Sequence, residues 1–146
     1  MAGSITDDVA VLTAAFAASD PRLDLWRRWP AVSDAEDAFS DQFACQEVSE
    51  SFTAFARSHG WGAVTVEGAE AEHPAADYHY WTRLLRGEDL VDVDWTARQY
   101  HNLHVISGRD PKVLNLPWPL VWEADDEIHP VAGRFTRMRS FTRPGS

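Results

Sequence analysis

The hydrophobic pattern of the chain changes its period at Gly60, and this change limits the folds that the sequence can adopt. Before Gly60, the apolar residues Val48, Phe52 and Phe55 follow one another at helical spacing. After Gly60, the segment 62–67 has the pattern of a strand. Helices that precede strands, rather than alternating with them, indicate an α+β fold in which N-terminal helices pack on an antiparallel sheet.

The length and composition of the chain fit one folded domain over residues 1–146. Hydrophobic residues make up 45% of the sequence, which excludes a disordered composition. No apolar run approaches the roughly 20 residues that a membrane helix needs, and no signal-peptide pattern opens the chain. A single cysteine cannot form an internal disulfide. We therefore expect a cytoplasmic protein that makes no association with a membrane.

The net charge of −10 argues against nucleic acid as a partner, because contacts to phosphate groups need lysine and arginine. The charge is distributed unevenly along the chain. The segment 128–146 holds four arginines and no acidic residue. We interpret this segment as a solvated terminal strand, since charge runs more often serve solubility than binding.

Capping residues and apolar spacing predict helices in the first part of the chain. We expect a helix over 6–18 with Thr6 as its N-cap. A short second helix opens at Asp20-Pro21 and ends at Pro30, and Ser33 with Glu36 resembles a capping box. A further helix begins between Gln42 and Cys45 and ends at His59, where Gly60 is a natural C-cap.

The second part of the chain predicts strands. A loop over 68–76, which contains Pro74, follows the strand at 62–67. The segments 78–85 and 90–95 flank a short turn, Arg86-Gly87-Glu88-Asp89, and therefore form an antiparallel hairpin. Further strands are expected at 120–122 and 133–141.

Three positions in these elements predict thiol chemistry. Cys45 is the only cysteine, and it lies in the first turn of its expected helix. A thiol attacks as the thiolate, which a helix N-terminus and an adjacent imidazolium both favour. His79 is able to act as that imidazolium and as the general base. The hairpin brings a residue near position 94 or 95 opposite position 79, so Asp94 is the candidate that orients His79, and Asp92 competes with it.

The residues around these positions resemble a known superfamily. The segments His79-Tyr80-Trp81 and Asp94-Trp95-Thr96-Ala97-Arg98-Gln99-Tyr100 are similar to the "H-x-W … D-x-T-A-R-Q-F" ending of small bacterial and phage papain-fold proteins. The resemblance to papain-like and transglutaminase-like cysteine enzymes covers about residues 41–100. Some members of that group are toxin domains or glutamine deamidases.

This resemblance implies a papain-like fold and a catalytic triad. Cys45 would be the nucleophile, His79 the base and Asp94 the orienting carboxylate. The oxyanion hole would use the Cys45 amide together with the side chain of Gln42. The substrate would be an amide of a protein or peptide, with either hydrolysis or acyl transfer as the outcome, and no cofactor or metal is implied.

Other interpretations of the same residues stay open at the level of sequence. Cys45 and His79 also suit a purely structural role in the core, and Asp94 suits a cap of the turn at 96–100. His73 is a rival base, and His101 with His104 is a weak candidate for zinc binding. A protein-binding module on a papain-like scaffold, without catalysis, is the alternative function.

Overall fold

The computed structural model describes residues 5–28, 45–70, 79–97, 117–124, 128–130 and 133–141. Several sequence-based expectations fall outside these ranges. They concern Pro30, the capping box at 33–36, Gln42, His73, Pro74, the segment 98–100, His101 and His104.

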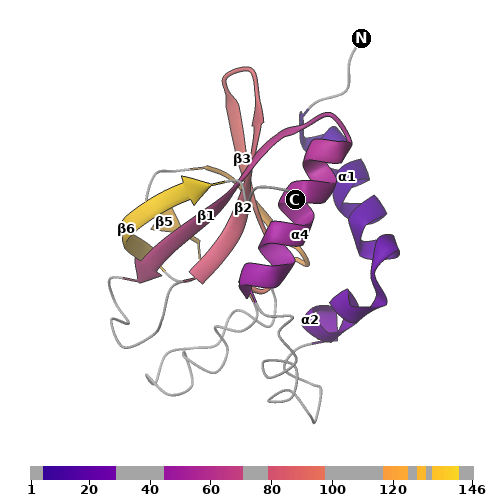
Figure 1. Ribbon diagram of the computed structural model, residues 1–146, viewed down its shortest axis with the longest axis horizontal. Coiled ribbons are helices and arrows are strands. Elements are labelled where there is room, and N and C mark those ends of the chain that lie inside the picture. Colours follow the sequence, from indigo (N-terminus) through magenta and orange to yellow (C-terminus); the bar gives the residue numbers. More distant parts are fainter. Residues whose placement is uncertain are drawn as a thin grey trace.

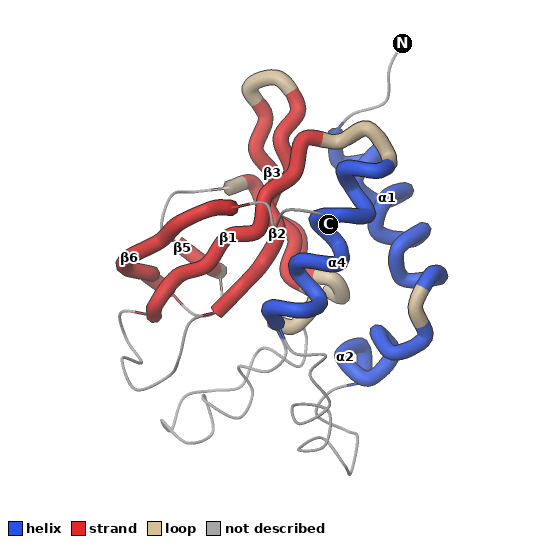
Figure 2. Tube along the Cα trace, in the orientation of Figure 1, coloured by secondary structure: helices blue, strands red, loops and turns tan. Residues whose placement is uncertain are grey.

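Helices lead the chain and strands follow, so the α+β prediction is confirmed (Figure 1). The helical elements are α1 (Ile5–Ser19), the 3₁₀ turn η1 (Pro21–Leu23), α2 (Asp24–Arg28) and α4 (Cys45–Ser58). The strands are β1 (Gly62–Glu70), β2 (His79–Arg86), β3 (Asp89–Asp94), β4 (Leu120–Glu123), β5 (Ile128–His129) and β6 (Gly133–Phe141). The strand order is β4-β3-β2-β1-β6-β5, and each neighbouring pair is antiparallel. Figure 2 shows the helices together on one side of the strands.

The ends of the helices agree with the capping residues in two places and differ in one. Asp20 caps η1 by accepting a hydrogen bond from the Arg22 backbone amide, as expected for Asp followed by Pro. Gly60 ends α4 with a φ of 88°, a left-handed conformation that glycine adopts without strain. Thr6, however, is not the N-cap of α1, because the helix already includes Ile5.

The expected strands are present, but β1 is longer than predicted and one strand was not predicted. The loop expected from residue 68 begins later, because β1 continues to Glu70 and pairs there with β6 across a register shift. Pairing along β1 therefore overrides the weak strand propensity of the small residues Gly68 and Ala69. The strands at 120–122 and 133–141 are present as β4 and β6, whereas β5 was not predicted.

The β2–β3 hairpin forms with a register that differs from the expected one. Arg86 pairs with Asp89 around a two-residue turn in which Gly87 has a φ of 59°. The ladder then places Thr82 opposite Val93, so that His79 would meet position 96 rather than 94 or 95. His79 and Asp94 consequently lie diagonally across the hairpin, on the same face of the sheet.

The main hydrophobic core lies between the sheet and the helices. Helix α4 packs its buried face on β1 and β2, and α1 adds Phe16, whose ring contacts the rings of Phe52 and Trp95. Trp95 directly follows β3 and is 1% exposed. The helical spacing of Val48 and Phe52 predicted that both side chains face the core, and both are fully buried.

A buried group of threonine hydroxyls ties α4 to the sheet. The Thr53 hydroxyl lies 2.9 Å from the hydroxyl oxygens of both Thr65 on β1 and Thr82 on β2. Thr82 in turn donates a hydrogen bond to the backbone oxygen of Ser49 at 3.0 Å. These bonds fix the position of α4 along the sheet, and with it the position of the residue at its N-terminus.

Aromatic side chains fill the opposite face of the sheet. Trp81 contacts the rings of Trp122, His129 and Phe135 at centroid distances of 6.0, 5.4 and 5.0 Å. Trp122 and His129 come from β4 and β5, the two outermost strands, and their rings are 4.8 Å apart. The sheet is therefore strongly curved, because strands from its two edges meet over this face.

Among the described helices, none has the length and apolar character needed to cross a membrane.

We predict that Thr53→Val destabilises the protein by about 2 kcal/mol, because it leaves the buried hydroxyls of Thr65 and Thr82 without one partner. Chemical denaturation measures the change in the free energy of unfolding. Ser58→Ala is the matched control, since the Ser58 hydroxyl bonds to a backbone oxygen at an exposed site. Equal effects of the two substitutions would contradict the structural role of Thr53.

Candidate active site

Cys45 lies at the N-terminus of α4 and is half-buried. The backbone N–H groups in the first turn of a helix have no acceptor within the helix, and the helix dipole is positive there. The position therefore favours a negative charge on the sulfur. The backbone N–H groups of the same turn are suited to bind another negatively charged atom next to the sulfur.

His79 is the first residue of β2, and its side chain is 2% exposed. Its Nε2 atom lies 2.7 Å from Oδ2 of Asp94. The side chain of Cys45 also interacts with His79 and favours the protonated form of the imidazole. Because Asp94 occupies Nε2, the ring nitrogen that remains for an interaction with the thiol is Nδ1. One imidazole thus connects the sulfur to the carboxylate.

Asp94 is the last residue of β3 and is fully buried. Its Oδ1 atom accepts hydrogen bonds from the backbone N–H of Thr96 at 2.9 Å and from the Thr96 hydroxyl at 3.4 Å. Its Oδ2 atom faces His79 and also His129, whose Nε2 lies 2.7 Å away. Asp94 therefore caps the following turn, as one sequence alternative proposed, and holds a histidine as well.

Asp92 does not contact His79. Its carboxylate accepts hydrogen bonds from the Trp81 indole at 2.9 Å and from the Arg83 guanidinium at 2.8 and 3.0 Å. Asp92 is thus a buried partner of Arg83 on the same face of the hairpin. Of the two carboxylates that the sequence left open, Asp94 is the one that bonds to His79.

The ionisation of the site follows from its burial and its charges. Burial disfavours the charged form of His79, but the charge and hydrogen bond of Asp94, together with Cys45, outweigh it and raise the pKa of His79 to about 10. Burial favours the neutral form of Asp94, yet the charge of His79 and the hydrogen bonds from both histidines hold the pKa of Asp94 below its ordinary range. His79 and Asp94 therefore form a buried ion pair at neutral pH.

His129 has the opposite tendency. Burial lowers the pKa of His129, and the positive charge of His79 acts in the same direction against the attraction of Asp94. His129 is therefore a neutral imidazole at neutral pH, and it donates its Nε2 proton to the carboxylate. No local sequence pattern predicts this contact, because β5 has only two residues and His129 lies 35 positions after Asp94.

A second polar group lies near Cys45. Tyr80 interacts with Glu67, which also accepts a hydrogen bond from Nε of Arg139 at 2.9 Å. Burial, the Glu67 carboxylate and the charge of Cys45 all raise the pKa of Tyr80, so the phenol keeps its proton at neutral pH. These three side chains come from β2, β1 and β6, and Tyr80 is the one that interacts with the thiol.

His79, Asp94 and His129 also have the composition of a metal site. They offer two imidazoles and one carboxylate, whose ligand atoms lie within 4.8 Å of one another, and such donors suit a divalent cation such as Zn²⁺. A cation bound to Nε2 of His79 would leave the proton on Nδ1, which could then not accept one from the thiol. Metal binding and activation of Cys45 are therefore mutually exclusive uses of His79.

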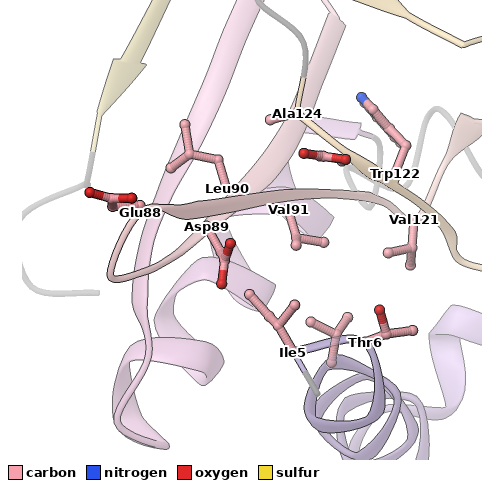
Figure 3. A pocket seen from close by; sticks show the side chains of 11 residues that line it. Ile5, Thr6, Glu88, Asp89, Leu90, Val91, Val121, Trp122 and Ala124 are labelled. Atoms are coloured by element: carbon pink, nitrogen blue, oxygen red, sulfur yellow. The ribbon is translucent and has the colours of Figure 1, made fainter.

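A separate pocket lies between the start of α1 and strands β3 and β4 (Figure 3). Ile5 and Thr6 line one side, and Val91 and Val121 face them across the opening. Neither Cys45 nor the buried histidines belong to its lining. This pocket is therefore distinct from the candidate active site.

Comparison of the chain with protein-family models, with curated proteins and with solved structures gave no match.

We predict that the stability of a Cys45→Ala variant falls as the pH rises above about 6.5. With its pKa raised, His79 keeps its proton in the folded state, while the unfolded chain loses it near pH 6.5, so folding then requires proton uptake. One proton of difference corresponds to about 1.4 kcal/mol per pH unit, or roughly 3 °C in Tm. The variant excludes titration of the thiol from the measurement.

Thermal unfolding between about pH 6 and 9 measures this slope. The control is the double variant Cys45→Ala/His79→Gln, in which the imidazole is absent and the part of the slope that it causes disappears. If the single and double variants lose stability in parallel, the Asp94 carboxylate does not hold a proton on His79.

Proposed function

We propose that the chain is a thiol-dependent amide hydrolase or acyltransferase of the papain-like or transglutaminase-like kind. The observation that carries the proposal is the buried hydrogen bond between Nε2 of His79 and Oδ2 of Asp94, together with the interaction of the Cys45 side chain with the same imidazole. The thiol stands at a helix N-terminus, the imidazole is buried, and the carboxylate is ionised. Each part has the environment that its proposed role needs.

The first chemical step is attack of the Cys45 sulfur on the carbonyl carbon of an amide. The thiol proton resides on Nδ1 of His79, and the charge of Asp94 stabilises the resulting imidazolium. As the new carbon–sulfur bond forms, an electron pair moves to the carbonyl oxygen. The backbone N–H groups at the start of α4 then stabilise the negative oxygen.

The second step breaks the carbon–nitrogen bond. The imidazolium of His79 gives its proton to the leaving nitrogen, and a thioester remains on Cys45. In a hydrolase, His79 next removes a proton from water, which attacks the thioester and releases a carboxylic acid and the thiol. In an acyltransferase, an amine takes the place of water.

The proposed substrate is an amide group of a protein or peptide, at its backbone or at a glutamine side chain. The half-buried position of Cys45 is consistent with a group that reaches the thiol from outside. Tyr80, which interacts with Cys45, supplies a phenol that is able to bond to a polar amide group near the thiol.

We predict that Cys45 reacts rapidly with iodoacetamide at pH 6, where an ordinary thiol is almost fully protonated. His79→Ala removes the imidazolium and is expected to lower the rate at this pH by about tenfold or more. The measurement is the rate of alkylation between about pH 5 and 9, followed by mass spectrometry.

His59→Ala is the matched control, because His59 is exposed, lies at the other end of α4 and stacks on Phe55. It is expected to leave the alkylation rate unchanged. A thiol that reacts only above about pH 8, and equally in all three proteins, would remove the basis for an enzyme. The alternative function, a protein-binding module without catalysis, would then be the one to test.

We also predict that the two buried aspartates of β3 differ in their effect on Cys45. Asp94→Asn removes the charge that holds the imidazolium, so the alkylation rate at pH 6 is expected to fall by about tenfold. Asp92→Asn weakens the ion pair with Arg83 and is expected to lower the Tm while preserving the alkylation profile. The reverse pattern would assign the orienting role to Asp92.

A further inference from the structure

Two histidines from distant strands donate to a single oxygen atom. Nε2 of His79 and Nε2 of His129 both lie 2.7 Å from Oδ2 of Asp94. The other oxygen, Oδ1, is occupied by the two groups of Thr96. Oδ2 therefore accepts hydrogen bonds from two imidazoles: that of His79, which faces the thiol, and that of His129 on β5.

The ring of His129 is held in place by aromatic side chains. It contacts Trp122 at 4.8 Å, Trp81 at 5.4 Å and Phe135 at 6.0 Å between ring centroids, and its side chain is fully buried. A buried ring enclosed by three others has little freedom to turn away from Asp94. The contact is thus a fixed part of the site.

Charged groups of the described residues approach the two histidines from several elements. Cys45 faces His79 from α4, and Asp94 faces both rings from β3. Asp92, also on β3, acts on His129 at longer range and is itself paired with Arg83. Tyr80 interacts with Cys45 and with Glu67, and Glu67 is paired with Arg139. Asp94 is thus the one carboxylate shown to bond to both rings.

We infer that His129 is a positioning residue that competes with His79 for Oδ2 of Asp94 and thereby makes the His79 imidazolium a readier proton donor. This inference rests on the proposed function. A hydrogen bond to a carboxylate lowers the basicity of that carboxylate, so each donor weakens the hold of Asp94 on the other. His129 therefore limits the stabilisation that Asp94 gives to a protonated His79.

This limit matters for the second half of the reaction. His79 must surrender its proton to the leaving nitrogen, and a general acid works best when its pKa lies near the working pH. A buried carboxylate that bonds to His79 alone would hold the imidazolium more strongly and make this transfer harder. His129 reduces that hold without contacting the substrate, the thiol or the reacting atoms.

The inference is tested by NMR titration of ¹⁵N-labelled histidine side chains in the Cys45→Ala protein, in which the thiol does not titrate. His129→Phe keeps an aromatic ring among Trp81, Trp122 and Phe135 but removes the donor. We expect the titration midpoint of His79 to rise by at least half a pH unit in this variant. His129→Gln, which retains an N–H donor, is expected to keep the midpoint of the parent.

A midpoint that stays constant or falls in His129→Phe would overturn the inference. A second measurement uses the Cys45→Ala parent alone and does not depend on the folding of further variants. There, His129 is expected to be neutral at pH 7, with its proton on Nε2. A protonated His129, or a proton found only on Nδ1, would also overturn it.

Addition of Zn²⁺ to the same sample tests the competing use of the three side chains. Loss of the Nε2 protons of both His79 and His129 at stoichiometric zinc would indicate a metal centre and would overturn the inference. Unchanged spectra would support hydrogen bonding to Asp94. Because these measurements do not involve the thiol, they are separate from the alkylation test: His129 can fail as a tuning residue while Cys45 still depends on His79.

Discussion

The fully buried carboxylate of Asp94 is the group on which the rest of the site depends. A charge removed from water is tolerated only where enough donors surround it. Here the donors come from the turn after β3, from β2 and from β5. The need to satisfy one anion therefore brings together three segments that are far apart in the sequence, and it ties the outermost strand β5 to the centre of the sheet.

The two faces of the sheet carry different kinds of side chain. On one face, α4 and α1 cover an apolar core and the buried threonine hydroxyls. On the other, aromatic rings enclose Asp92, Asp94 and the two histidines. This second face keeps the polar groups dry, which strengthens their mutual attraction. Helix α4 connects the two faces, because its core side fixes its position and its first residue reaches His79.

The sequence alone predicted most of the described helices and strands, and it brought His79 and Asp94 together. Helical spacing and a glycine cap located α4, and a short turn between two apolar segments located the hairpin, because these signals are local. The same local reasoning brought Asp94 close to His79, although the pairing register was wrong and the contact is diagonal. His129 was missed because its partner depends on the curvature of the whole sheet, which no local pattern encodes. The role of Gln42 stays a prediction, since it lies outside the described residues.

Alternation along one strand has a consequence for the robustness of the site. Asp94 and Trp95 are neighbours, and they point to opposite faces: one holds the histidines, and the other packs between Phe16 and Phe52. A disturbance of the helical core therefore reaches the carboxylate through a single peptide unit. The geometry around Asp94 and the packing of the helical core are therefore coupled, so loosening of α1 would disturb the contacts of the carboxylate.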